Sequence, residues 1–287
     1  MAEQGKVTVG ALVDMKRRGE KISMITCYDY PNALLVDRAG MDIVLVGDSL
    51  GMTVLGYPNT LPVTMTEMVV FASAVTRACK RAFVIGDMPY MSYQPSVEAA
   101  VINAGRFMAE ASCDGVKLEG GAAMADRVKA IVSAGIPVMG HLGLTPQSAS
   151  MQGGFKVQAK TSDAARRLLE DCLALEEAGV YSILLELVPA RVAEFISARL
   201  SVPTISIGSG AGCDGHCMIY HDVIGMFEAF LPKHVKQYAN VSPILQEALN
   251  RNVAEIKSGA YPEPGKHDFK INDEVFADFL NSVERKG

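Results

Sequence analysis

Five successive apolar runs of the sequence end directly in an ionisable residue, and these residues are the first candidates for chemistry. The residues are Asp48, Asp87, Glu119, His141 and Glu186. Taken singly, a carboxylate after a strand is more often a helix N-cap or a solvated loop residue. Capping alone does not explain five such endings in a row. We therefore expect the five side chains to gather at one site.

Three of the acids, Asp48, Asp87 and Glu119, follow consecutive runs. Neighbouring strands lie about 4.8 Å apart, so their carboxylates can converge on one point. Crowded carboxylates cannot all stay charged unless a cation lies among them. Oxygen ligands without thiolate or imidazole favour a hard ion, Mg²⁺ rather than Zn²⁺. We predict that these acids bind Mg²⁺, some of them through water that the ion retains.

Lys117 lies two residues before Glu119, and side chains alternate across a strand. The two residues therefore share one face, while Val116 and Leu118 take the face that packs against helices. An ammonium group that points inward is costly without a partner. Lys117 is expected to meet a carboxylate partner or an anionic ligand. A purely structural pair with Glu119 is the alternative, which accounts for the cost but gives no reason for a lysine at this position.

The elements that position these residues are short apolar runs separated by helical patterns. Little polar alternation within the runs is typical of parallel strands covered on both faces. We expect strands at 22–28, 42–47, 83–88, 115–119, 137–140, 182–187, 203–208 and 217–220. This order predicts a single (β/α)8 TIM barrel, with its active site at the carboxyl ends of the strands. The last gap is too short for a helix, so a doubly wound open sheet stays an alternative.

The clearest helix covers 163–178, with Ser162 as its candidate N-cap and Gly179 as its stop. Two long stretches without a helical pattern, 49–66 and 142–162, are expected to be functional loops, with lids over the barrel mouth as one role. The catalytic barrel is expected to fill residues 1–262. Residues 263–287 should form a linker and a short tail with an amphipathic helix at 273–284.

Three short patterns suggest other chemistry. Residues 47–51 fit the G-x-S-x-G motif of serine hydrolases, and residues 210–215 fit the dinucleotide motif G-x-G-x-x-G. The first pattern is short, and the second opens no helix. Cys213, His216, Cys217 and His221 crowd together, but their spacing matches no common structural zinc site. We expect a tight turn or an anion-binding nest at 210–215 and no zinc.

Composition excludes several classes of function. The chain has 287 residues, 49% of them hydrophobic, and a formal net charge of −5. A negative chain without a basic patch indicates no nucleic-acid or anionic-membrane partner. No run of roughly 20 apolar residues could span a bilayer, and residues 1–20 resemble neither a signal nor a transit peptide. The six cysteines are therefore expected to be reduced and the protein to be cytoplasmic.

Eight segments together resemble the ketopantoate hydroxymethyltransferase family. They are ITCYDY at 25–30, VLVGDSLGM at 44–52, TLPVT at 60–64, DMP at 87–89, VKLEGG at 116–121, GHLGLTPQS at 140–148, LELVP at 185–189 and IGSG at 207–210. The likeness runs from about residue 8 to residue 262. It fails at the cysteines and His216 of 213–217, which further weakens the case for a zinc site. It does not cover the tail.

The resemblance implies a (β/α)8 barrel of the isocitrate lyase and phosphoenolpyruvate mutase type, assembled as a homodecamer. It implies transfer of a hydroxymethyl group from 5,10-methylenetetrahydrofolate to 3-methyl-2-oxobutanoate, giving ketopantoate for pantothenate biosynthesis through an enolate chelated by Mg²⁺. The family's metal contacts fall on Asp48, Asp87 and Glu119. Its substrate contacts fall on Asp48, Ser49, Asp87 and Lys117, and its proton acceptor falls on Glu186.

Two readings stay open beside this one. A lyase or mutase of the same superfamily would also use Mg²⁺ and a 2-oxo acid, but such enzymes commonly carry an acidic cysteine in a mobile loop, and 142–162 contains none. A non-catalytic barrel would show gaps in the acidic set, and none is missing. His141 is a second candidate for contacting the substrate or handling protons, or it only ties down its own loop.

Overall fold

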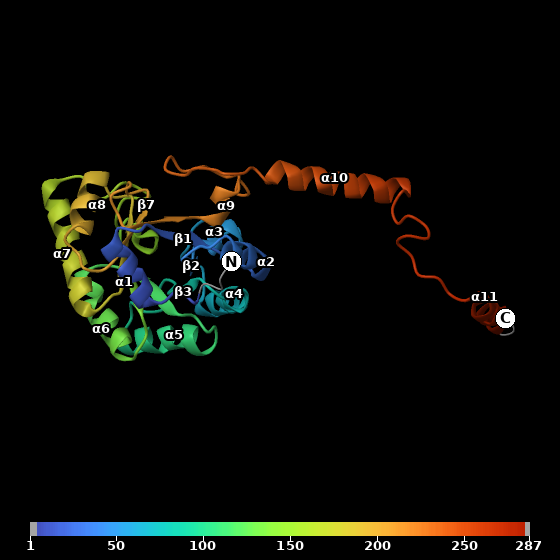
Figure 1. Cartoon of the computed structure of the whole chain (residues 1–287), viewed down its shortest axis with the longest axis horizontal. Helices are drawn as coiled ribbons and strands as arrows, with labels where there is room; N and C mark the ends of the chain where they lie inside the picture. Colours follow the sequence, from blue (N-terminus) through green and yellow to red (C-terminus); the bar gives the residue numbers. More distant parts are fainter. Residues whose placement is uncertain (1–4, 285–287) are drawn as a thin grey trace. The chain divides into compact units, whose positions relative to one another are not determined.

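Eight parallel strands close into one barrel, in which β8 pairs with both β7 and β1. Figure 1 shows the helices α5, α6, α7 and α8 along the outside of the strands. The computed structural model describes residues 5–284. The strands are β1 Ile22–Thr26, β2 Ile43–Val46, β3 Phe83–Asp87, β4 Gly115–Glu119, β5 Val138–Gly143, β6 Ser182–Glu186, β7 Thr204–Ile207 and β8 Gly215–Met218. The predicted barrel is therefore confirmed, and the pairing of β8 with β1 excludes an open sheet.

Helices and two short 3₁₀ segments connect the strands. They are α1 Val9–Arg18, α2 Tyr30–Arg38, α3 Leu50–Thr53, α4 Met65–Ala78, α5 Val97–Ala109, η1 Ala122–Met124, α6 Ala125–Ser133, η2 Pro146–Ser148, α7 Ser162–Ala178, α8 Ala190–Ser197 and α9 Tyr220–Val223. Residues 208–214 are all described and contain no helix, as the short last gap predicts. The stretches 49–66 and 142–162 are not wholly helix-free, because α3 and η2 lie inside them.

Side-chain alternation divides the apolar residues of the barrel into two cores. Ile43 and Leu45 of β2 point into the barrel and belong to its inner cluster. Val44 and Val46 of the same strand point outward and pack in the cluster under the helices. Val116 and Leu118 also belong to the outer cluster, which confirms the predicted inward face of Lys117. This alternation lets a polar residue at a strand end reach the barrel mouth.

Local capping explains where several helices begin. Thr64 and Glu67 form a reciprocal capping box at the start of α4. The N-cap of α7 is Thr161, whose hydroxyl accepts from the backbone N–H of Ala164, so the predicted Ser162 cap is wrong by one residue. Gly179 ends α7 in the left-handed region at φ 100°, as predicted.

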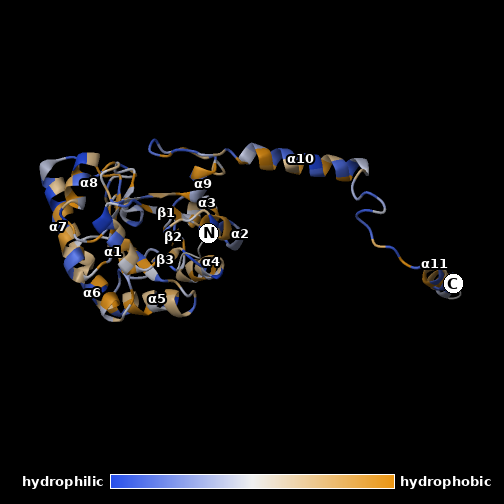
Figure 2. Ribbon diagram, viewed as in Figure 1, coloured by the Kyte–Doolittle hydropathy of each residue, from blue (hydrophilic) through white to orange (hydrophobic). Residues whose placement is uncertain are grey.

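Residues from Tyr238 onward form a second compact unit. It contains α10 Ser242–Ser258 and α11 Asp273–Glu284, and none of the described residues of either helix is buried. Hydrophobic and hydrophilic residues interleave along both helices (Figure 2). The contacts thus divide the chain after Gln237, earlier than the predicted division after residue 262. The helix at 273–284 has the predicted bounds, whereas α10 was not predicted.

Among the described residues, no helix combines the length and the apolar character that a membrane span requires.

Candidate active site

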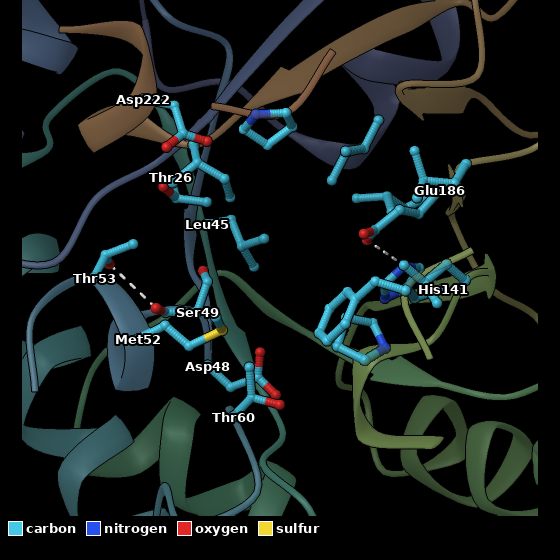
Figure 3. Close-up of a pocket in the computed structure, with 18 of the residues that line it drawn as sticks. Thr26, Leu45, Asp48, Ser49, Met52, Thr53, Thr60, His141, Glu186 and Asp222 are labelled. Carbon is cyan, nitrogen blue, oxygen red and sulfur yellow. Dashed lines mark hydrogen bonds and ion pairs between the residues drawn. The ribbon is translucent and has the colours of Figure 1, made fainter. Parts of the chain in front are cut away.

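A cavity of about 540 Å³ lies at the carboxyl ends of the strands, where the barrel fold places active sites (Figure 3). All seven residues that the sequence analysis predicts for the site line this cavity. These residues are Asp48, Ser49, Asp87, Lys117, Glu119, His141 and Glu186. The strand ends and the loops that follow them therefore bring together residues spread over almost 140 positions, from Asp48 to Glu186.

The buried ammonium of Lys117 is paired with Asp87 and not with Glu119. Its Nζ lies 2.8 Å from Oδ1 of Asp87, and both side chains are at most 4% exposed. The two residues are register partners on β3 and β4, so the expected carboxylate partner comes from the neighbouring strand, and the alternative pair with Glu119 is not formed. Burial alone would lower the pKa of Lys117, but the surrounding carboxylates, Asp87 first, raise it, so the ammonium stays charged.

Asp48 lies close to the two other acids of the cavity, Asp87 and Glu119. Its backbone N–H donates to Oδ2 of Asp87 at 3.1 Å, and its own Oδ2 accepts from Nε2 of Gln147 at 3.0 Å. Burial and the charges of Asp87 and Glu119 raise the pKa of Asp48 well above its usual range. Burial also raises the pKa of Asp87, although Lys117 opposes this. The site therefore holds more negative charge than its own cations neutralise.

Gln147 was not predicted as a site residue, yet it connects two of the acids. Besides Asp48, it contacts Glu119, because its backbone N–H donates to Oε2 of that residue at 3.0 Å. Its Oε1 accepts from the hydroxyl of Tyr93 at 2.8 Å, and Nε2 donates to the Met88 carbonyl at 2.9 Å. The sequence could have indicated Gln147, because it belongs to the 140–148 segment that resembles the family and follows His141 closely.

His141 lies between the lysine and two acids. Its Nδ1 lies 3.2 Å from Nζ of Lys117 and 3.5 Å from Oε1 of Glu119, and its Nε2 lies 3.2 Å from Oε2 of Glu186. Burial and Lys117 favour the neutral imidazole, but the two carboxylates outweigh them and raise its pKa to about 9. His141 thus contacts the other site residues directly and does more than hold its own loop.

Glu186 ends β6, and its side chain is 16% exposed, more than those of Glu119 and His141. The backbone around it is tightly constrained. Leu187 has φ 47°, which is uncommon for a branched residue and typical of strain at functional sites. Gly143 has φ 89°, and a Cβ there would collide with the Glu186 carbonyl, so only glycine fits. This packing holds the Glu186 carboxylate at the mouth of the cavity, beside His141.

The hydroxyl of Ser49 forms a hydrogen bond of 2.8 Å with the hydroxyl of Tyr28. In the part of the chain that the structure describes, no histidine contacts this hydroxyl, which leaves a serine nucleophile without a base. Ser49 instead precedes the short helix α3 at the cavity wall and presents a polar group there.

The residues of the cavity fit a cation, although they do not form a closed ligand set. Between residues 5 and 284, no group of three or more His, Cys, Asp or Glu side chains is close enough to hold a metal by itself. Oε1 of Glu119 is nonetheless buried without a hydrogen bond, whereas Oδ1 of Asp87 has the Lys117 ammonium as its partner. Together with the excess negative charge around Asp48, this favours an ion that keeps part of its water shell, as Mg²⁺ does.

The four residues that crowd together near the end of the barrel sequence do not form a metal site among the described residues. They are Cys213, His216, Cys217 and His221. Cys213 and Cys217 are buried, whereas His216 is exposed on β8. Adjacent residues of a strand point to opposite faces, so His216 and Cys217 diverge. All six cysteines are free and buried, as expected for structural thiols.

Solved structures with the same fold were found at low sequence identity. A putative phosphonomutase from Burkholderia cenocepacia has a TM-score of 0.59 at 14% identity, covering 88% of this chain and 98% of that one. A phosphonopyruvate hydrolase in complex with oxalate and Mg²⁺ has a TM-score of 0.57 at 12% identity, covering 97% and 96%. A 2,3-dimethylmalate lyase of the phosphoenolpyruvate mutase/isocitrate lyase superfamily has 0.54 at 13%, covering 97% and 98%. These likenesses establish a shared fold.

Sequence relatives are far more similar. A 3-methyl-2-oxobutanoate hydroxymethyltransferase from Moorella thermoacetica is 54% identical over 270 residues, which are 94% of this chain and 100% of that one. The enzyme of that name from Syntrophomonas wolfei is 53% identical over 94% and 98%. The profile of the ketopantoate hydroxymethyltransferases matches residues 6–264. On this similarity, the chain belongs to the ketopantoate hydroxymethyltransferase family.

Proposed function

We propose that this enzyme transfers the one-carbon unit of 5,10-methylenetetrahydrofolate to C3 of 3-methyl-2-oxobutanoate. The C3–H bond breaks, a bond forms between C3 and the methylene carbon, and the bonds from that carbon to the folate nitrogens break. Water supplies the hydroxyl group, so the products are ketopantoate and tetrahydrofolate. The observation that carries this proposal is the buried Lys117 ammonium among Asp48, Asp87 and Glu119, with Glu186 at the same cavity.

A divalent cation, Mg²⁺ first, would be held by Asp48 and Asp87, with Glu119 in contact directly or through water. The charge excess around these acids supports this assignment. So does the fold, which in the solved phosphonopyruvate hydrolase holds oxalate together with Mg²⁺. When bound, the ion would supply positive charge and Lewis acidity to the carboxylate and 2-oxo groups of the substrate.

Lys117 binds and orients the oxo acid. Its ammonium stays charged because the carboxylates around it raise its pKa, and its low exposure makes its field strong. A positive group fixed before the reaction stabilises negative charge that develops on the substrate oxygens. Ser49, at the wall of the same cavity, can donate a hydrogen bond to the substrate carboxylate.

Glu186 accepts the C3 proton. A general base must lie within reach of the proton that it removes, and Glu186 lines this cavity outside the hydrogen bonds that join Asp48, Asp87 and Gln147. Nε2 of His141 lies 3.2 Å from Oε2 of Glu186 and, when the imidazole is protonated, orients this carboxylate by an ion pair.

Two assays test the proposal. Purified enzyme should convert 3-methyl-2-oxobutanoate to ketopantoate when methylenetetrahydrofolate is present, and EDTA should abolish the conversion until Mg²⁺ is restored. Without folate, the enzyme should exchange the C3 hydrogen of the oxo acid with deuterium from the solvent. An enzyme that shows neither reaction with Mg²⁺ present would disprove the proposed chemistry.

We also propose that the chain forms a homo-oligomer, for which the decamer of the resemblance is the specific expectation. Exposed apolar residues on one helix of the second unit support an interface. They are Ile244, Leu245, Leu249, Val253 and Ile256 of α10. Analytical ultracentrifugation of the whole chain tests this, and a monomer at micromolar concentration would contradict it.

A further inference from the structure

Part of the cavity is not used by the chemistry proposed above. The cavity measures about 540 Å³, within the range of roughly 300–1,000 Å³ that holds drug-sized ligands, whereas the oxo acid is small. Phe155, Phe227 and Phe230 line this cavity as well, and the proposed chemistry uses none of them. Phe155 and Phe230 are more than half exposed, at 58% and 55%. The cavity therefore presents flat apolar surfaces that the described protein atoms leave uncovered.

Asp222 of α9 lines the same cavity and is a second unused feature. It is only 6% exposed, yet its carboxylate has no hydrogen bond and no ion pair within the described residues. Burial alone raises its pKa to about 6. Lys233 and His234 line the cavity too, but neither forms an ion pair with Asp222 in the described structure. A buried acid without a partner costs stability, which points to a ligand that supplies hydrogen-bond donors.

The position of Asp222 separates it from the acids around Lys117. Figure 3 shows Asp222 with Thr26 at one side of the pocket and Glu186 with His141 at the other. The backbone N–H of Tyr220 donates to Oγ1 of Thr26 at 3.0 Å, which ties the start of α9 to the end of β1. This hydrogen bond fixes the backbone at the start of the helix that carries Asp222, so the helix is positioned before any ligand binds.

The ligand that these groups fit is a planar heterocycle with two adjacent N–H donors. A carboxylate accepts two parallel hydrogen bonds from such an edge, and charge-assisted bonds of this kind are the stronger ones. Phenylalanine rings cover the apolar faces of a planar ring by stacking or edge contacts. The 2-amino and N3–H groups of a reduced pterin form this donor pair.

We propose that Asp222 binds the pterin edge of the folate co-substrate, and that Phe155, Phe227 and Phe230 contact its ring faces. This assignment rests on the proposed function, in which the one-carbon donor is a reduced folate. It places the folate and the oxo acid in one cavity, the pterin at Asp222 and the oxo acid near Lys117 and Glu186. The methylene carbon then lies between them.

The first test is the variant Asp222→Asn. The KM for methylenetetrahydrofolate should rise about 10- to 100-fold, because a hydrogen bond to a charged group contributes about 1.5–3 kcal/mol. Binding of 6-methyltetrahydropterin, followed by calorimetry, should weaken by a similar factor. Folate-independent deuterium exchange at C3 should stay within about twofold of wild type. Asp163→Asn removes the same charge from an exposed position on α7 and should change none of these values.

The second test needs only the wild-type enzyme. A tetrahydropterin analogue without the 2-amino group should bind at least about tenfold more weakly than 6-methyltetrahydropterin, since one of two donors is lost. Equal binding of the two pterins, or an unchanged folate KM in Asp222→Asn, would overturn the role of Asp222. Neither result would affect the proposed function, which fails only if wild-type enzyme shows no C3 exchange and no transfer.

Discussion

Nζ of Lys117 lies 2.8 Å from Oδ1 of Asp87, whereas Asp48 is bonded to the neutral amide of Gln147. Both acids come at the end of an apolar strand, yet their electrostatic surroundings differ. Asp87 balances a buried cation, and Asp48 adds to the repulsion among carboxylates. Removing one charge or the other should consequently have opposite effects on the stability of the metal-free protein.

We expect Asp48→Asn to stabilise the metal-free protein, on the order of 1 kcal/mol, because repulsion falls. Asp87→Asn should destabilise it by about 3–5 kcal/mol, since Lys117 is left buried without its closest partner. Urea unfolding in EDTA measures both effects. Both variants should bind Mg²⁺ more weakly by calorimetry and lose nearly all turnover. Wild-type Mg²⁺ affinity in both would show that the metal assignment is wrong.

Gln147 should act as a positioning residue, because its side chain and backbone hold Asp48 and Glu119. We expect Gln147→Leu to weaken Mg²⁺ binding by about 10- to 100-fold, the usual effect of losing a group that orients metal ligands. Saturating Mg²⁺ should restore much of kcat, which a loss of catalytic chemistry would not allow. Gln158→Leu, in the same loop but bonded to the exposed Lys156 carbonyl, is the matched control.

Asp222 should lower the stability of the ligand-free protein as pH rises. Its pKa is about 6 when folded and roughly 3.9 when unfolded, so the folded state binds the proton more tightly. Stability from this group is present below about pH 4 and is lost as pH rises through 6. The stability advantage of Asp222→Asn over wild type should therefore grow by about 1–2 kcal/mol from about pH 4.5 to 7.5. A constant difference in urea unfolding would contradict the burial of an unpaired carboxylate.

Much of the fold and the site could be predicted because both depend on local patterns. Apolar runs that alternate with helical patterns specify the barrel, and the parity of Lys117 and Glu119 on one strand specifies which residues face inward. The partner of Lys117 could not be predicted, because it depends on the register between β3 and β4. Gln147 lies in the 3₁₀ segment η2 and Asp222 in the short helix α9. The positions of such short segments depend on tertiary contacts, which the periodicity of the sequence does not reveal.

The tail after residue 265 should be dispensable for chemistry. All residues of α11 are exposed, and the cavity is lined by residues no later than His234. We expect deletion of residues 266–287 to leave kcat and both KM values within about twofold of wild type, with the oligomeric state measured in parallel. A truncated protein that is soluble and assembled like wild type, but inactive, would contradict this.

Glu186→Gln provides the sharpest test of the proposed base. Glutamine has nearly the same shape but cannot accept the C3 proton, so deuterium exchange without folate should slow by about 10²–10⁴-fold. Binding of Mg²⁺ and of the oxo acid should change little, because Glu186 contacts His141 and not the acids around Lys117. Glu98→Gln, on the exposed start of α5, is the control for removing a glutamate charge. If Glu186→Gln exchanges at the wild-type rate, the base is a different group, and His141, which lies 3.2 Å away, is the next to be replaced.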